Sequence, residues 1–203
     1  MSAKTKGNVR PLILASTSRY RRALLERLDL PFEVVPADID ETPHFEEAPI
    51  GAAMRLAEAK ARAVAERRPG TLVIGSDQIA DLDGRHVGKP GSHEAAIAQL
   101  KALSGRTVTF HTGVALCDAE SGRCRSKLVD VVSTFRPLGD TEIDEYLRRE
   151  RPYDCAGAVR SERLGIVLFE RIVSDDPTAL IGLPLIALID LLRAEGVDAL
   201  EKR

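Results

Sequence analysis

The sequence predicts an α/β domain built on a mixed sheet, and three patterns support this prediction. The first four or five residues of the stretch Leu72–Gln78 predict a strand without a polar face, which is typical of a strand covered on both sides of its sheet. The apolar stretch Leu12–Ala15 predicts a second strand, and a helical pattern follows it directly. Two longer strands, 108–116 and 128–135, are joined by a polar turn containing glycine, as in an antiparallel hairpin. Buried strands, a hairpin and intervening helices together indicate the α/β class.

The spacing of apolar residues predicts the remaining elements. Helices are expected from Ser18 onward, over 50–67, over 94–103, from 140 onward and over 184–196. Short strands are expected at 32–35 and 164–169. The length of 203 residues fits one domain, which we place at 10–203, preceded by a polar, disordered tail at 1–9.

Composition excludes some classes of function. The 29 Lys and Arg residues against 31 Asp and Glu leave no broad basic surface for nucleic acid, and 4% aromatic residues are few for base stacking. The most apolar segment, Leu183–Leu192, is interrupted by Asp190 and is too short to span a membrane. Three cysteines without a CxxC spacing fit a reducing compartment, so a cytoplasmic location is expected.

Common catalytic motifs are missing from the sequence. It contains no GxxxxGK[ST], no GxGxxG after a strand, no HExxH and no GxSxG. A phosphate ligand would therefore have to be bound by individually placed cations.

Asp77 follows directly after the predicted buried strand that begins at Leu72, at its carboxyl end. In open α/β sheets, ligands bind in the crevice at that end. Asp77 is therefore a candidate metal ligand or general base. An Asp that caps a turn is an equally good interpretation of this segment alone.

A second candidate site lies where the first strand meets its helix. Ser16 and Ser18 stand at the turn, and Ser18 is a suitable N-cap. Arg19, Arg21 and Arg22 follow at the positive end of the helix, where cations are unfavourable unless an anion binds there. We interpret this conflict as evidence for a phosphate site.

Further cations and carboxylates are candidate site residues. Asp38, Asp40 and Glu41 form an acidic loop that either binds a hard cation such as magnesium or is simply solvated. Lys60 lies beside the apolar stripe of the long helix, where it either extends to solvent or reaches a pocket. Lys89 is held between glycine and proline. These groups suit metal-assisted attack on a phosphoryl group.

Five motifs in the order found here resemble the Maf family. They are Leu14–Ser18 with Arg21, Asp38–Glu41, Glu58–Ala61, Gly75–Gln78 and Gly88–Pro90. The likeness covers about residues 11 to 196. It implies an elongated, two-lobed Maf/ITPase-like domain with a mixed twisted sheet, a cleft between the lobes and a homodimer. It also implies a hydrolase that uses Mg²⁺ or Mn²⁺ to convert a nucleoside triphosphate into a monophosphate and pyrophosphate.

The resemblance assigns a role to each matching position. The catalytic and metal-binding roles fall on Asp77 as proton acceptor and metal ligand, Glu41 as metal ligand, and Lys60 and Lys89 as catalytic cations. The phosphate contacts fall on Ser16, Ser18 and Arg21.

Within the family, the branch that acts on 7-methyl-GTP is the closer match, because this chain has Tyr20, Gln78 and Glu162. The resemblance assigns substrate selection to these three residues. Because 7-methylguanine is cationic, an aromatic face at Tyr20 would contribute roughly 0.5–2 kcal/mol. Glu162 could accept hydrogen bonds from the N1–H and 2-amino groups of guanine. Packing of Tyr20 on its helix and a surface charge at Glu162 are the structural alternatives. Arg19 departs from the family's usual proline.

Two other functions remain open at the level of sequence. The first is the same reaction on dTTP or UTP. The second is a non-catalytic, nucleotide-sensing regulator of septum formation and cell division.

Overall fold

A single mixed sheet forms the centre of the protein, for which a computed structural model describes residues 10–201. The tail predicted at 1–9 lies outside the described residues. The strand order is β2-β1-β3-β5-β6-β7, with β4 paired to β3. The strands are β1 (Leu12–Leu14), β2 (Phe32–Val34), β3 (Leu72–Leu82), β4 (Arg85–Val87), β5 (Thr107–Asp118), β6 (Cys124–Phe135) and β7 (Phe169–Val173).

The helices flank this sheet. They are α1 (Arg19–Leu25), α2 (Pro49–Ala65), α3 (His93–Leu103), α4 (Asp140–Glu150) and α5 (Leu185–Ala194). Short 3₁₀ turns are η1 (Glu26–Leu28), η2 (Ala156–Ala158), η3 (Leu164–Leu168) and η4 (Ala179–Ile181). Among residues 10–201, no helix combines the length and the apolar character needed to cross a bilayer.

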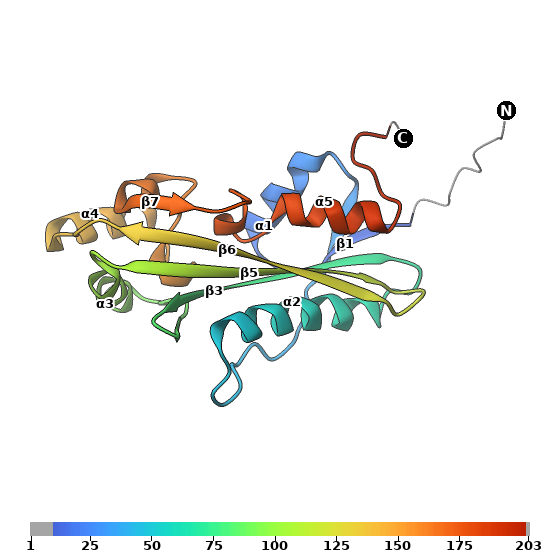
Figure 1. The fold of residues 1–203 in the computed structure, drawn as a ribbon, viewed down its shortest axis with the longest axis horizontal. Coiled ribbons are helices and arrows are strands. Elements are labelled where there is room, and N and C mark those ends of the chain that lie inside the picture. The colour runs from blue at the N-terminus through green and yellow to red at the C-terminus, as the bar shows by residue number, and fades with distance from the viewer. Residues whose placement is uncertain (1–9, 202–203) are drawn as a thin grey trace.

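The sheet is mixed, as predicted. Strand β1 runs parallel to both β2 and β3. The pairs of β3 with β5, β5 with β6, and β6 with β7 are antiparallel. The predicted hairpin is confirmed, and its strands β5 and β6 pair from Thr107 opposite Thr134 to Cys117 opposite Cys124. The molecule is elongated along these long strands (Figure 1).

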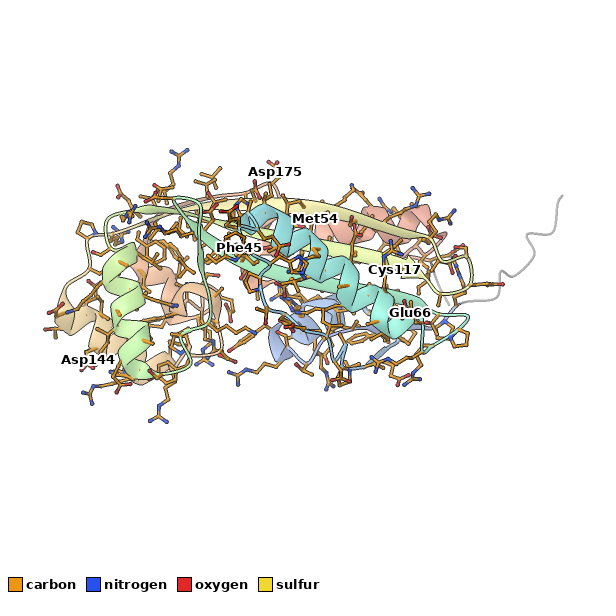
Figure 2. The ribbon with its side chains drawn as sticks, turned by 90° about the horizontal axis from the view of Figure 1, so that it is seen from below. Phe45, Met54, Glu66, Cys117, Asp144 and Asp175 are labelled. Carbon is orange, nitrogen blue, oxygen red and sulfur yellow. A yellow bond between two sulfur atoms is a disulfide. The ribbon has the colours of Figure 1, made fainter. Side chains whose placement is uncertain are left out.

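Helices cover both faces of the sheet at the end that contains β1, with α2 on one side and α1 and α5 on the other (Figure 1). Side chains alternate accordingly. Ile13 and Val73 pack toward α2, and Leu14 and Ile74 pack in the cluster that includes α1 and α5. Figure 2 shows α2 lying along the sheet, with Met54 in its first half and Glu66 beyond its end. This double coverage explains the strand without a polar face.

The core divides along the length of the sheet. One cluster, which includes Phe110, Phe135 and Ile143, lies at the end covered by α3 and α4. Separate clusters lie around α1 and α5 and around α2 at the other end. The molecule therefore has two lobes joined by the continuous strands β3, β5 and β6.

The strand predicted at 164–169 is wrong. Leu164–Leu168 forms η3, and strand β7 begins only at Phe169. The cause is a tight turn, in which the N–H of Gly165 donates to the carbonyl of Arg160. A Cβ on Gly165 would lie 2.5 Å from that carbonyl oxygen, so only glycine allows this approach. The apolar side chains of this turn divide between core and surface, since Leu168 is buried whereas Ile166 and Val167 are 53% and 43% exposed.

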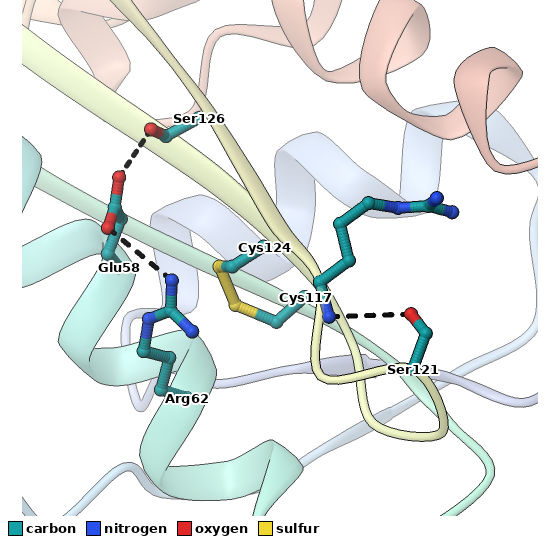
Figure 3. Close-up of a disulfide and its surroundings, with 7 residues drawn as sticks. Glu58, Arg62, Cys117, Ser121, Cys124 and Ser126 are labelled. Atoms are coloured by element: carbon teal, nitrogen blue, oxygen red, sulfur yellow. Dashed lines mark hydrogen bonds and ion pairs between the residues drawn. A yellow bond between two sulfur atoms is a disulfide. The ribbon is translucent and has the colours of Figure 1, made fainter.

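Cys117 and Cys124 form a disulfide across the hairpin (Figure 3). Cys155 is free. The sequence suggested a reducing compartment, in which disulfides are rare, so this pair differs from expectation. The reason is the register of β5 and β6, which places the two residues directly opposite each other. Nothing in their spacing along the chain indicates that pairing.

Candidate active site

A cavity of about 750 Å³ opens beside the central strand β3. Strand β1 pairs with β3 only as far as Ile74, and β4 pairs with it only from Ala80. Between these points, the described part of the chain places no strand on that edge of β3. The cavity is lined by the turn Ala15–Arg21, the loop after β2, and residues around η2 and η4. The interrupted pairing gives side chains from both faces of the sheet access to one cavity.

The structure brings most of the predicted site residues together. The cavity lining includes Ser16, Ser18, Tyr20, Arg21, Glu41, Lys60, Gln78, Lys89 and Glu162. Asp40 is not in the lining, because its carboxylate turns back to accept a hydrogen bond from the N–H of Thr42 at 2.9 Å.

Asp77 does not lie at the end of a strand, and that prediction is wrong. Strand β3 continues to Leu82, and Asp77 is paired opposite Gly113 in the middle of it. The strand continues because β5 supplies an antiparallel partner beyond the point where β1 ends. The carboxylate also lies behind the cavity lining, where it contacts the lining residues Lys60 and Arg21.

Lys60 connects two carboxylates at the floor of the cavity. Its Nζ lies 2.7 Å from Oδ1 of Asp77 and 2.9 Å from Oε2 of Glu41. Lys60 is only 5% exposed. Its side chain therefore reaches the pocket and does not extend to solvent, which was the other interpretation of its position in the sequence. Burial would raise the pKa of Glu41, but the hydrogen bond and charge of Lys60, followed by Lys89 and Arg21, hold it below its ordinary value.

Two glycines allow α2 to approach the sheet closely enough for this contact. A Cβ on Gly75 would lie 2.1 Å from the carbonyl oxygen of Ala57, and one on Gly113 would lie 2.6 Å from that of Ala53. The helix therefore rests directly on the backbone of β3 and β5. Lys60 comes about one helical turn after Ala57, and Asp77 comes two residues after Gly75 on the strand. The contact of Ala57 with Gly75 therefore places Lys60 over Asp77.

The turn before α1 has the geometry expected from its sequence. The hydroxyl of Ser18 accepts a hydrogen bond from the N–H of Arg21 at 3.4 Å, and the hydroxyl of Ser16 accepts one from the N–H of Ser18 at 3.1 Å. Arg21 is held from behind, since its Nε donates to the carbonyl of Gly182 at 2.8 Å. Its terminal nitrogen lies 3.7 Å from Asp77.

Gln78 and its neighbours fasten the segment that contains η4. The amide nitrogen of Gln78 donates to the carbonyls of Ala179 at 2.8 Å and Leu180 at 3.1 Å. The hydroxyl of Thr112 donates to the Ala179 carbonyl as well, and that of Ser76 donates to the carbonyl of Gly182. Because its nitrogen is engaged in this way, Gln78 can offer its carbonyl oxygen to the cavity.

Tyr20 stands between charged groups. Its hydroxyl accepts a hydrogen bond from Arg19 at 2.7 Å and donates to Asp154 at 3.2 Å. The guanidinium carbons of Arg19 and Arg160 lie 4.8 and 5.2 Å from the centre of the ring. Burial raises the pKa of Tyr20 to about 12, although the hydrogen bond from Arg19 opposes it. Burial likewise raises the pKa of the neighbouring Cys155 to about 12, so this thiol remains protonated.

Sequence reasoning missed several residues of this site. Asp154, Arg160 and Thr112 touch predicted site residues, yet they come from distant parts of the chain. Their only signal in the sequence is a charged or hydroxyl side chain in an otherwise unremarkable segment. Within residues 10–201, no group of three or more His, Cys, Asp or Glu is arranged to bind a metal by itself.

The fold and the site define an α/β protein whose cleft gathers arginine, lysine and serine around two carboxylates, a set suited to a polyphosphate ligand. The sequence model of the family described as "Maf-like protein" matches residues 11–195. The chain belongs to the Maf family.

Named relatives are similar over nearly the whole chain. A 7-methyl-GTP pyrophosphatase of Ralstonia nicotianae is 58% identical over 183 residues, covering 90% of this chain and 94% of the relative. One of Bordetella avium is 56% identical over 191 residues, covering 93% and 95%. Among solved structures, a HAM1 protein of Coxiella burnetii aligns with a TM-score of 0.45 and 20% identity, covering 78% of this chain and 98% of that one.

Proposed function

We propose that this protein hydrolyses 7-methyl-GTP to 7-methyl-GMP and pyrophosphate. The observation that supports this most directly is the name shared by relatives that are 55–58% identical over about nine-tenths of the chain. The chemistry of the cavity is consistent with it, because cations for a triphosphate and an aromatic ring for a cationic base line the same space.

The triphosphate would bind at the turn before α1. Arg21 lines the cavity, and only its Nε is engaged by the carbonyl of Gly182, so its terminal nitrogens would be the ones to contact phosphate. Lys89 lines the same cavity from the loop after β4. Ser16 and Ser18 would add hydroxyl donors. These groups would neutralise the charge that develops on the phosphates during attack.

The acidic groups fit a hard divalent cation, Mg²⁺ or Mn²⁺. Lys60 contacts only one oxygen of Asp77 and one of Glu41, so each carboxylate has a second oxygen to offer. Mg²⁺ typically binds one or two carboxylates together with substrate phosphates and water, and therefore needs no third protein carboxylate. When bound, the ion would polarise the phosphoryl group and lower the pKa of an attacking water.

Asp77 is the proposed proton acceptor. Its side chain retains about 10% exposure and contacts Lys60 and Arg21, which line the cavity, so it lies next to the space that a substrate would occupy. Asp77 would take a proton from the attacking water. Lys60 and Arg21 would hold its carboxylate in place.

The base would be read by other residues of the same cavity. Tyr20 would offer its ring to the cationic 7-methylguanine. Glu162 would accept from the N1–H and 2-amino groups, which uracil and thymine do not present as a pair. Gln78 would order the substrate beside Asp77.

We further propose that the protein acts in the cytoplasm, where nucleoside triphosphates are available, and as a homodimer. Because the cytoplasm is reducing, we expect Cys117 and Cys124 to be reduced there and to face each other as two thiols.

Initial rates across a panel of triphosphates test the proposal. We expect 7-methyl-GTP to give the highest kcat/KM, well above GTP, UTP and dTTP, and chelation of divalent cations to abolish turnover. Preference for UTP or dTTP would assign the protein to the other branch of the family. Binding of nucleotide by calorimetry without pyrophosphate release would contradict an enzymatic role.

A further inference from the structure

Arg160 contacts both groups that would read the base, although it is not in the cavity lining. Its guanidinium carbon lies 5.2 Å from the centre of the Tyr20 ring. Its Nε lies 3.6 Å from Oε1 of Glu162. Tyr20 belongs to α1 and Glu162 to the segment after η2, so Arg160 is the link between two distant parts of the chain.

Arg160 is itself held rigidly. Its side chain is 14% exposed, and one guanidinium nitrogen lies 3.2 Å from a carboxylate oxygen of Glu150, at the end of α4. Its backbone N–H donates to the hydroxyl of Tyr146 at 3.1 Å. Its carbonyl accepts from Gly165 in the tight turn described above. A planar guanidinium fixed in this way can serve two neighbours with little further loss of conformational entropy.

One donor of Arg160 has no hydrogen-bond partner. Its Nε is buried and unpaired within the described residues. Its nearest recorded carboxylate oxygen, on Glu162, stands at 3.6 Å, just beyond hydrogen-bonding distance. An unpaired buried donor is costly, so a small movement of Glu162 toward Arg160 would be favourable.

We propose that Arg160 is a positioning residue for base recognition, which acts through Tyr20 and Glu162 rather than by touching the substrate. This inference rests on the proposed function. Arg160 orients the carboxylate of Glu162 toward the cavity and supports the Tyr20 ring from its own side. Its loss frees both groups, so the penalty falls on substrates whose base uses them. The triphosphate site, built on Arg21 and Lys89, is left intact.

The chain offers a matched control in Arg163. Its Nε lies 3.4 Å from the other oxygen of the same Glu150, but its side chain is 62% exposed. Although Arg163 follows Glu162 in the chain, its side chain makes no hydrogen bond or ion pair with Glu162 or Tyr20 among residues 10–201. Arg160→Gln and Arg163→Gln therefore remove the same charge from the same partner, and only the first disturbs the base-reading groups.

The experiment compares kcat/KM for 7-methyl-GTP and UTP in wild type, Arg160→Gln, Arg160→Lys and Arg163→Gln. We expect Arg160→Gln to reduce kcat/KM for 7-methyl-GTP about tenfold more than for UTP, chiefly through KM. Arg163→Gln should leave the ratio of the two substrates within about twofold of wild type. Arg160→Lys retains a charge for Glu150 but has no planar fork, so it should also lose preference, even if Arg160→Gln folds poorly.

Two different failures can be told apart. A wild-type protein without preference for 7-methyl-GTP refutes the proposed function and this inference with it. A wild-type protein with that preference, alongside folded Arg160 variants that keep it or lose activity equally on both substrates, refutes the inference alone.

Discussion

The Nζ of Lys60 lies 2.7 Å from Oδ1 of Asp77, and this ion pair is buried between α2 and β3. It joins the helix to the strand at the cavity floor. A buried charge without its partner is costly, so the pair connects the stability of the fold to the chemistry of the site.

Replacement of Asp77 by Asn should abolish turnover without unfolding the protein. The amide oxygen can still accept a hydrogen bond from Lys60, but the residue can no longer take a proton. A general base typically contributes about 10²–10⁴ in rate, so we expect a loss of at least about 10²-fold in kcat. Asp40→Asn is the control, because the carboxylate of Asp40 accepts a hydrogen bond from Thr42 and, unlike that of Asp77, makes no ion pair with Lys60 or Arg21 among residues 10–201. Activity of Asp77→Asn within about tenfold of wild type would remove the base assignment.

Replacement of Lys60 by Met should destabilise the protein strongly. The change leaves Asp77 with Arg21 at 3.7 Å as its remaining recorded cationic partner. Removal of one member of a buried pair costs about 3–5 kcal/mol, measurable by urea unfolding. Asp77→Asn in the Lys60→Met background should recover part of that loss, because it removes the uncompensated charge. Additive losses in the double variant would show that the two groups are not coupled.

Replacement of Tyr20 by Ala should lower kcat/KM for 7-methyl-GTP more than for UTP. The cation–π contribution of roughly 0.5–2 kcal/mol corresponds to about a 2- to 30-fold difference between the substrates. Tyr20→Phe keeps the aromatic face and loses only the hydroxyl contacts with Arg19 and Asp154. It should therefore retain the preference. Equal losses of Tyr20→Ala on both substrates would mean that the ring does not read the base.

Replacement of Gly75 by Ala should destabilise the fold by about 3 kcal/mol or more. The added Cβ would lie 2.1 Å from the Ala57 carbonyl oxygen and would push α2 away from the sheet. Gly51→Ala is the matched control. Gly51 lies on α2 itself, and a Cβ added there meets nothing nearer than 4.0 Å. That change should leave stability unchanged or raise it by up to about 1 kcal/mol. Thermal unfolding of both variants, in parallel with wild type, measures the contrast.

Asp118 should make stability depend on acidic pH. Burial would raise its pKa, but hydrogen bonds from Ser121, the N–H of Glu120 and Arg10 outweigh burial and lower it from 3.8 to about 2. A lowered folded-state pKa stabilises the protein above the unfolded value, and that contribution disappears as the pH falls from about 4 to about 2. The difference in unfolding free energy between wild type and Asp118→Asn should therefore be largest near neutral pH. A difference that stays constant down to pH 2 would contradict this assignment.

Local patterns in the sequence were sufficient for much of the fold. The covered strand at Leu72–Ile74, the hairpin of β5 and β6 and the cap at Ser18 are confirmed, since each depends on residues close in the chain. The strand at 164–169 failed because an apolar run by itself does not specify extended backbone. The turn depends on the approach of Gly165 to Arg160, which is a tertiary contact.

Sequence patterns were enough to predict the α/β class, the family and the kinds of charged groups available to the site. How those groups combine depends on the three-dimensional fold. It placed Asp77 within a strand and behind Lys60, and it brought Arg160 against Tyr20 and Glu162. The physical reason is that periodicity and capping act over a few neighbouring residues, whereas ion pairs form between residues that distant strands and helices bring within about 4 Å.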